Sequence, residues 1–118
     1  MIALALALAA TLAQAQIPSP APVAGQPSAA GTQDVWDKRC TFCHGADGQS
    51  QTKKGKQYKA PNFTKAKWQK HTTDDEIVEA ITNGVPKSKM PAFKDKLSPE
   101  EIQSLVPFLR AFAKGPTR

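Results

Sequence analysis

Five consecutive positions, Cys40-Thr41-Phe42-Cys43-His44, hold both cysteines of this 118-residue chain and one of its two histidines. On a helix, residues three and four apart lie on one face, so both thiols and the imidazole would point toward a single object. We therefore treat the rest of the chain as the scaffold for whatever these three side chains bind.

The spacing Cys-x-x-Cys-His is typical of covalent c-type haem attachment. The two thiols add to the vinyl groups of the haem as thioethers, and the adjacent imidazole coordinates the iron. The sequence thus predicts one covalent haem c, attached through Cys40 and Cys43 and coordinated by His44.

Two other interpretations of the cysteine pair are weaker. A zinc site normally needs four ligands, and beyond Cys40, Cys43 and His44 the chain offers only His71 or a carboxylate, without a second Cys-x-x-Cys. A thioredoxin-like dithiol would follow a strand in an alternating strand and helix pattern, which the sequence does not show. Neither a zinc site nor a redox dithiol is expected.

The amino terminus differs sharply in composition from the rest. The first 33 residues carry no charged side chain, and all 16 Lys and Arg and all 10 Asp and Glu lie in 34–118. Residues 2–13 are apolar apart from Thr11, a run shorter than the roughly 20 residues that span a bilayer but suited to a signal peptide. We expect a signal peptide over 1–15, although no basic residue precedes the run; an uncleaved anchor is the alternative.

The segment 16–33 is mainly Pro, Ala, Ser, Gly and Gln, a composition that predicts a disordered linker. The remaining 34–118 is a domain of about 85 residues, a size at which the stability of a single core is marginal. A covalently attached haem would complete this core. Export to an oxidising compartment, the periplasm, fits the use of both cysteines for haem.

Helix signals occur at three places in the domain. A first helix is expected over 34–43, with Trp36 on the same face as Cys40 and packed in the core. A capping box at 73–76 begins a second helix that ends at Asn83-Gly84. Another box at 98–101 begins a third, which contains Pro107, expected to kink it.

The segments between these helices carry the other candidate site residues. Residues 49–60 are polar and rich in lysine, which predicts a solvated loop. Pro61 follows and offers a rigid carbonyl as an acceptor for the non-coordinating N–H of His44. His71 is expected at the solvated surface, without a role.

Met90 is the only methionine besides the initiator, and it lies between Pro86 and Pro91, which block a regular helix. A methionine in such a loop fills a gap in the core or ligates iron, because a soft thioether favours Fe(II). With Cys-x-x-Cys-His upstream, we predict that Met90 is the sixth ligand.

Together these residues resemble the small monohaem class I cytochromes c of bacteria. The resemblance covers 34 to about 113 and includes the haem motif, Pro61-Asn62, Asn83-Gly84, Met90-Pro91 and an amphipathic last helix. It implies an all-α fold of three to four short helices wrapped around one covalent haem, with the first and last helices crossing.

By the same resemblance, Cys40 and Cys43 are the thioether sites, His44 is the proximal ligand and Met90 the distal one. Pro61 is then the carbonyl partner of His44. Trp68 resembles a family position near the haem propionates; the alternative is a partly buried anchor.

The net charge of +6 points to the class of partner. Nucleic acid is not expected, because an exported haem protein does not meet DNA and the basic residues do not alternate with an ordered array of aromatic residues. A basic ring around the haem edge would instead steer short-lived encounters with an acidic redox protein, although simple solubility also explains the charge. The lysines that flank the ligand loop are Lys87, Lys89, Lys94 and Lys96.

These features predict a monomeric one-electron carrier that makes and breaks no bond and is therefore not an enzyme. It would meet the membrane only through its partners or an uncleaved leader. One rival is a haem enzyme of the peroxidase type, which needs an open sixth position that Met90 would close. The other is the subunit that admits electrons into a larger dehydrogenase or oxidase.

Overall fold

The computed structural model describes residues 9, 13–16 and 27–114, and this portion is helical with no β-strand. The all-α prediction is confirmed. The helices of the described portion are α1 (Ala29–Arg39), α2 (Thr41–His44), α3 (Lys53–Gln57), α4 (Ala66–His71), α5 (Asp74–Asn83) and α6 (Pro99–Ala111), followed by the 3-10 turn η1 (Phe112–Lys114). Most of the predicted signal peptide and most of the predicted linker lie outside the described residues.

Helix α1 begins at Ala29, so the predicted domain boundary at residue 34 lies inside a helix. The Oγ of Ser28 accepts a hydrogen bond from the N–H of Gly31 at 3.1 Å, which caps the first turn. The buried Thr32 adds a bond from its hydroxyl to the Ser28 carbonyl. The absence of charge before residue 34 therefore did not mark the start of the fold.

The single helix predicted over 34–43 is two helices in the structure. Helix α1 ends at Arg39, Cys40 caps it with its backbone N–H bonded to Trp36, and α2 starts at Thr41. The backbone N–H of His44 bonds to the Cys40 carbonyl at 2.9 Å, so the helical spacing of the motif is kept across the junction.

Two short helices were not predicted. Helix α3 lies within 49–60, where a solvated loop was expected, and its first turn is capped by Thr52, whose hydroxyl accepts from the N–H of Gly55. Helix α4 has no capping side chain. Helices α3 and α4 have only five and six residues, and their surfaces are mostly exposed and rich in lysine. Their hydrophobic periodicity is too weak to predict a helix. The described portion thus has more helices than the three to four expected.

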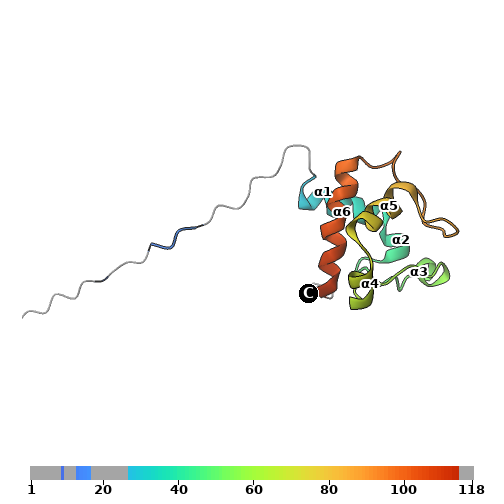
Figure 1. Cartoon of the computed structure of the whole chain (residues 1–118), viewed down its shortest axis with the longest axis horizontal. Helices are drawn as coiled ribbons and strands as arrows, with labels where there is room; N and C mark the ends of the chain where they lie inside the picture. The colour runs from blue at the N-terminus through green and yellow to red at the C-terminus, as the bar shows by residue number, and fades with distance from the viewer. Residues whose placement is uncertain (1–8, 10–12, 17–26, 115–118) are drawn as a thin grey trace, which may run out of the picture.

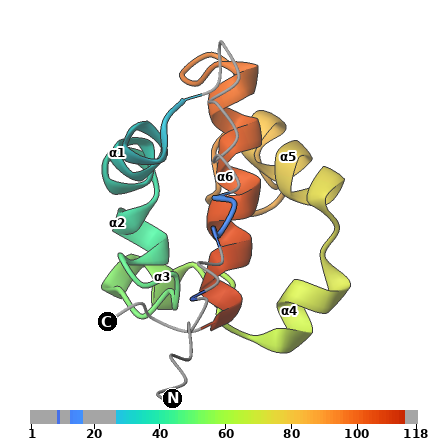
Figure 2. The same cartoon turned by 90° about the vertical axis from the view of Figure 1, so that its left-hand side faces the viewer.

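Helix α6 is the centre of the domain. In Figure 2 it stands between α1 and α2 on one side and α4 and α5 on the other, and α1 and α5 both pack against it (Figure 1). The predicted contact between the first and last helices is confirmed. The buried core residues are Trp36, Phe63, Ile77, Ile81, Phe93, Leu97, Ile102, Leu105, Val106 and Leu109.

The capping boxes predicted at the starts of α5 and α6 are present, because Thr73 pairs with Glu76 and Ser98 with Glu101. Pro107 lies inside α6 with an exposed side chain, and the helix continues through it without interruption. The hydrogen bond that Pro107 cannot donate therefore does not end the helix. Within the described portion, no helix has both the length and the apolar character needed to cross a bilayer.

Arg110 on α6 ties three elements together. Its guanidinium donates to the Asp74 carboxylate at 2.8 Å, to the Thr72 carbonyl at 2.7 Å and to the Gln69 carbonyl at 2.9 Å. Gln69 in turn donates to the carbonyls of Phe63 and Leu109. These charge-assisted bonds fix α4 against the end of α6.

Candidate functional site

The motif Cys40 to His44 lies on α2 and at the junction before it, with its histidine against the aromatic core. The imidazole of His44 stacks on Phe63 with ring centroids 4.7 Å apart, and the ring of Trp36 lies 6.0 Å away. Both cysteines are free and partly buried, and Cys40 packs against the hydrophobic core. The predicted attachment residues are thus brought to one edge of the core.

Burial changes the protonation of two of these side chains. It lowers the pKa of His44 from 6.5 to about 4 and raises the pKa of the Cys40 thiol from 9.0 to about 12. At neutral pH the imidazole is uncharged and keeps a nitrogen lone pair free, while the thiol stays protonated. A neutral imidazole beside an apolar thiol fits a haem iron ligand beside a thioether better than a thiolate metal site.

The described residues also offer no set of three or more Cys, His, Asp or Glu side chains placed to hold a metal ion among them. A four-ligand zinc site therefore finds no support in the arrangement of these side chains. The donors present fit a covalent haem, whose own ring nitrogens supply four ligands to the iron.

The loop after α2 folds back onto the motif. The Thr52 hydroxyl shares its one proton between the carbonyls of Phe42 and Cys43, both at 2.9 Å, while its oxygen caps α3. Gly55 lies so close to the backbone of Cys43 and Ser50 that a Cβ at this position would meet their carbonyl oxygens. Helix α3 is thereby fixed against α2, and the backbone of the haem motif has little freedom.

Pro61 lies near His44, but the structure places a third residue between them. Ser50 donates from Oγ to the Pro61 carbonyl at 2.5 Å, and the same Oγ lies 3.4 Å from Nδ1 of His44. The direct bond expected from Pro61 to the imidazole is not among the recorded hydrogen bonds. Sequence reasoning missed Ser50, because nothing in a polar loop distinguishes one serine from its neighbours.

Met90 lies far from the motif in sequence, on the loop between α5 and α6. Gly84, at a φ of 75°, turns the backbone, and Val85 N–H donates to the Met90 carbonyl at 3.2 Å. The Met90 N–H donates to Oγ of Ser88 at 3.1 Å. The Met90 side chain is half-buried and packs against the same core as Cys40. The structure records no bond between Met90 and the motif, and its role as a ligand stays a prediction.

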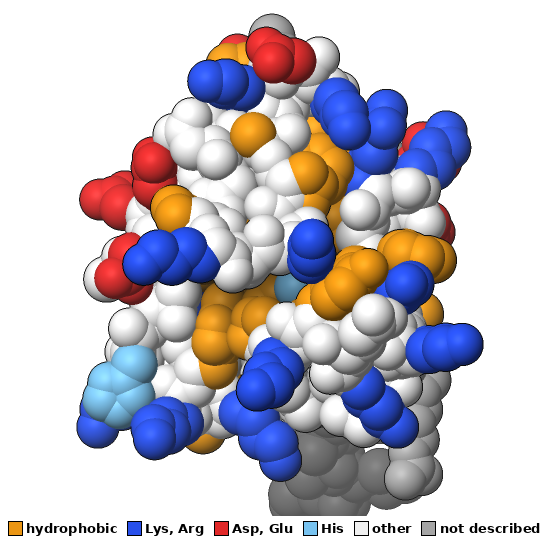
Figure 3. Space-filling model, turned by 90° about the vertical axis from the view of Figure 1, so that its right-hand side faces the viewer, with side chains coloured by type: hydrophobic (Ala, Val, Ile, Leu, Met, Phe, Trp, Pro, Cys, Tyr) orange, Lys and Arg blue, Asp and Glu red, His pale blue; other side chains and the backbone are white. Residues whose placement is uncertain are grey.

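A hollow lined by apolar side chains opens on the face shown in Figure 3, with a histidine side chain at its base and lysines distributed around it. The lysines on either side of Met90 are exposed, as are most of those on and near α3 and α4. In the described residues, Lys38 with Asp34 is the only lysine salt bridge. The positive charge around the hollow is therefore not neutralised by acidic neighbours.

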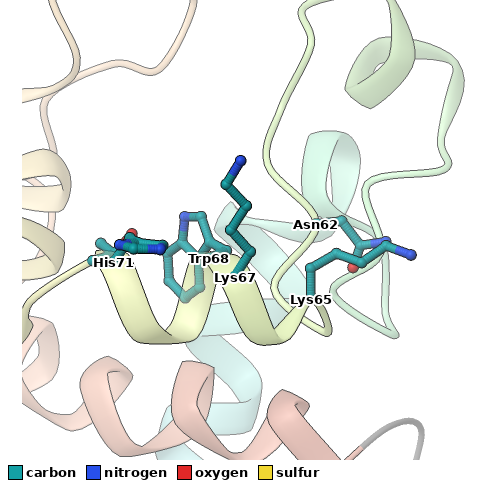
Figure 4. A pocket seen from close by; sticks show the side chains of 6 residues that line it. Asn62, Lys65, Lys67, Trp68 and His71 are labelled. Carbon is teal, nitrogen blue, oxygen red and sulfur yellow. The ribbon is translucent and has the colours of Figure 1, made fainter.

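Trp68 and His71 lie beside an open surface cavity of about 480 Å³ on α4 (Figure 4). The Trp68 ring is half-buried, 4.5 Å from the ring of Phe63 and 5.9 Å from the Arg110 guanidinium. His71 is exposed at the same cavity. The alternative interpretation of Trp68 as a partly buried anchor agrees with these contacts.

Comparisons with known proteins agree with this arrangement. A family profile described as cytochrome C oxidase, cbb3-type, subunit III matches residues 27–109. The cbb3-type cytochrome c oxidase subunit FixP of Bradyrhizobium sp. (strain ORS 278) is 29% identical over 91 residues, which are 77% of this chain and 29% of FixP. The chain thus spans about a third of the length of this curated relative.

Two solved structures are similar in fold. The KustC0563 c-type cytochrome is 41% identical, with a TM-score of 0.64 over 69% of this chain and 95% of that one. The c-type cytochrome NirC is 22% identical, with a TM-score of 0.58 over 76% of this chain and all of that one, and supports the fold alone.

These relatives imply covalently bound haem c, as the sequence predicted. The family profile covers α1 to α6 almost completely, including the Cys-x-x-Cys-His motif and the loop that carries Met90. The chain therefore belongs to the family of cbb3-type cytochrome c oxidase subunit III, in which it forms a small, all-helical, monohaem c-type cytochrome domain.

Proposed function

We propose that this domain is a one-electron carrier in which Cys40 and Cys43 hold the haem and His44 and Met90 are the axial ligands. The observation that carries the proposal is the placement of a neutral, core-stacked His44 beside both cysteines at the same hydrophobic core that Met90 borders. When bound, the haem supplies reversible exchange of one electron between Fe(III) and Fe(II).

The residues of the chain have distinct tasks in this proposal. Phe63 and Trp36 hold the imidazole of His44 in one orientation, and the buried core excludes water from that side of the ring. A thioether from Met90 would favour Fe(II) and raise the reduction potential. A filled sixth position leaves no place for a substrate oxygen, so the protein makes and breaks no bond.

The partners follow from the surface charge. The unpaired lysines around the hollow suit an acidic docking surface on a redox protein, and electrostatic steering would give fast association. In this proposal the carrier is a monomer that forms short-lived complexes for repeated electron delivery. Export to the periplasm is part of the proposal, in keeping with a family of exported or membrane-associated cytochromes.

A second candidate is favoured by one observation. Both the family profile and FixP are named as oxidase subunits, and the chain matches only part of FixP. The domain would then admit electrons into a larger oxidase. Co-purification from native membranes separates the two cases, since a free carrier is recovered alone and a subunit is recovered with the oxidase.

The coordination is tested by optical spectra of oxidised and reduced holoprotein, made with a c-type maturation system, for wild type and Met90→Ala with and without cyanide. We expect low-spin, six-coordinate wild type with the weak near-infrared iron–sulfur band and resistance to cyanide, all lost in Met90→Ala. A wild type that is already high-spin and binds cyanide or peroxide readily contradicts the carrier and supports a haem enzyme of the peroxidase type.

A further inference from the structure

Ser50 occupies a backbone conformation that its residue type rarely adopts. Three non-glycine residues of the described portion have a positive φ: Ser50 at 58°, Lys59 at 55° and Lys87 at 64°. Both lysines are exposed, but Ser50 is 4% exposed. A glycine adopts this conformation freely, whereas other residues are strained there. The position keeps a serine although glycine would relieve the strain, so the contacts of its hydroxyl are of interest.

The hydroxyl lies between two groups that the site uses. Oγ is 2.5 Å from the Pro61 carbonyl oxygen and 3.4 Å from Nδ1 of His44. The backbone N–H of Ser50 also bonds to the His44 carbonyl at 2.9 Å. Ser50 is therefore attached to His44 through its backbone and faces the ring of the same residue with its side chain.

The directions of these hydrogen bonds follow from what each atom can donate. A carbonyl only accepts, so the Ser50 hydroxyl must donate its proton to Pro61. Its oxygen lone pairs are then directed to Nδ1, which must carry the proton if Nε2 binds iron. The chain of bonds runs from Nδ1–H to Oγ and from O–H to the Pro61 carbonyl, and each bond polarises the next.

We propose that Ser50 is a positioning residue that relays the Pro61 carbonyl to the imidazole of His44, fixes the ring orientation and the proton on Nδ1, and increases the electron donation of the ring to the iron. The inference rests on the proposed role of His44 as the axial ligand. Partners of this kind orient a ligating histidine and raise its basicity.

The relay differs from a direct bond between Pro61 and His44 in one testable way. With a direct bond, removing the Ser50 hydroxyl leaves the proton on Nδ1 hydrogen-bonded and the iron unaffected. With the relay, the same removal leaves Nδ1–H without its acceptor, because Oγ of Ser50 is the atom beside Nδ1 and the Pro61 carbonyl reaches the imidazole only through it.

The experiment compares wild-type holoprotein with Ser50→Ala and Ser50→Gly. Reduced, low-spin protein with 15N-labelled histidine gives the Nδ1–H signal of His44 and its rate of exchange with solvent, and a redox titration gives the potential. Ser50→Gly removes the hydroxyl and also the backbone strain, so it remains folded even if Ser50→Ala does not. Ser104→Ala removes a half-buried hydroxyl elsewhere, one bonded to the Glu101 carbonyl.

We expect both Ser50 variants to exchange Nδ1–H about three- to tenfold faster, the range for one lost hydrogen bond. Their potentials should rise, because a less basic imidazole stabilises Fe(III) less. Ser104→Ala should change neither value. Retention of the near-infrared iron–sulfur band in all variants would show that Met90 is undisturbed.

Two results would overturn the relay. Unchanged exchange and potential in both Ser50 variants means that the hydroxyl does not support the ring. A change in Ser50→Ala that is absent in Ser50→Gly means that the backbone conformation, and not the hydroxyl, is responsible. A wild type in which His44 does not bind iron overturns the proposed function as well, and its spectrum reveals this before any variant is compared.

Discussion

The segments next to the two proposed iron ligands are held in different ways. The loop from α2 to Pro61 is anchored by hydroxyl and backbone bonds, with Ser50 and Gly55 buried. The loop from Gly84 to Pro91 is mostly exposed, and Met90 is held mainly through a short turn and one serine. If His44 and Met90 ligate iron as proposed, the difference indicates that the histidine is fixed in place and that the methionine can be released.

This asymmetry suits a carrier whose two ligands have different demands. The histidine is adjacent to the covalent attachment and cannot move far without distorting α2. The methionine loop can rearrange with little loss of buried contacts, because regions with few buried contacts open at low free-energy cost. Matched substitutions in the two regions, two at glycines and two at hydroxyls, should show whether the regions differ in stability and in cyanide binding.

The largest effect is expected for Gly55→Ala, in α3 beside the haem motif. The added Cβ meets the carbonyl oxygens of Cys43 and Ser50, which are backbone atoms that cannot turn aside. We expect a loss of about 3 kcal/mol or more in the free energy of unfolding, measured by denaturant titration of holoprotein. Gly31→Ala, where the Cβ meets only ordinary contacts, is the control and should be neutral or stabilising.

Gly84→Ala makes the corresponding change in the methionine loop. Here φ is 75° and the Cβ would lie 2.8 Å from the Met90 carbonyl oxygen, but the loop can yield. The expected loss of stability is about 1–3 kcal/mol, with cyanide binding more tightly and the iron–sulfur band weaker. If Gly84→Ala costs as much stability as Gly55→Ala and leaves cyanide binding unchanged, the two loops are not different.

Thr52→Ala removes the hydroxyl that joins the haem motif to α3. Loss of its bonds to the Phe42 and Cys43 carbonyls and of the cap on Gly55 should lower stability by about 1–2 kcal/mol. Thr52→Ser keeps the oxygen and should retain most of the stability. Thermal unfolding followed at the haem absorption band provides the measurement, and equal losses in both variants would contradict the hydrogen-bond explanation.

The smallest change is expected for Ser88→Ala, the hydroxyl that supports Met90. Its bonds to Val85 and Met90 are exposed, so stability should fall by only about 0.5–1 kcal/mol. The rate of cyanide uptake should nevertheless rise, because opening of the loop precedes binding. The Nδ1–H exchange of His44 should not change, and a change there would show that the two loops are coupled.

The parts of the fold that were predicted correctly rest on strong local signals. The capping boxes at Thr73 and Ser98 and the apolar face of α6 identified two helices before any tertiary contact was known. The cysteine motif identified the cofactor, because its spacing specifies the chemistry. Each of these signals is contained in a few neighbouring residues.

The parts that were missed depend on contacts between distant residues. Helix α3 packs against α2, and the sequence of its five lysine-rich residues does not predict this contact. The start of α1 depends on one serine cap within an uncharged segment. Ser50 acquires its position only when Pro61, eleven residues later, folds back over it. No pattern among neighbouring residues predicts such contacts.

The contact between α1 and α6 has a consequence for the order of events during synthesis. Trp36, four residues before Cys40, packs against Phe108 and Phe112, which are made about 70 residues later. The chain emerges from its amino end, so the core around the motif cannot close until Phe108 and Phe112 have been made. Until then the partly buried thiols of Cys40 and Cys43 lack the finished core around them, so we expect haem attachment to precede burial of the motif.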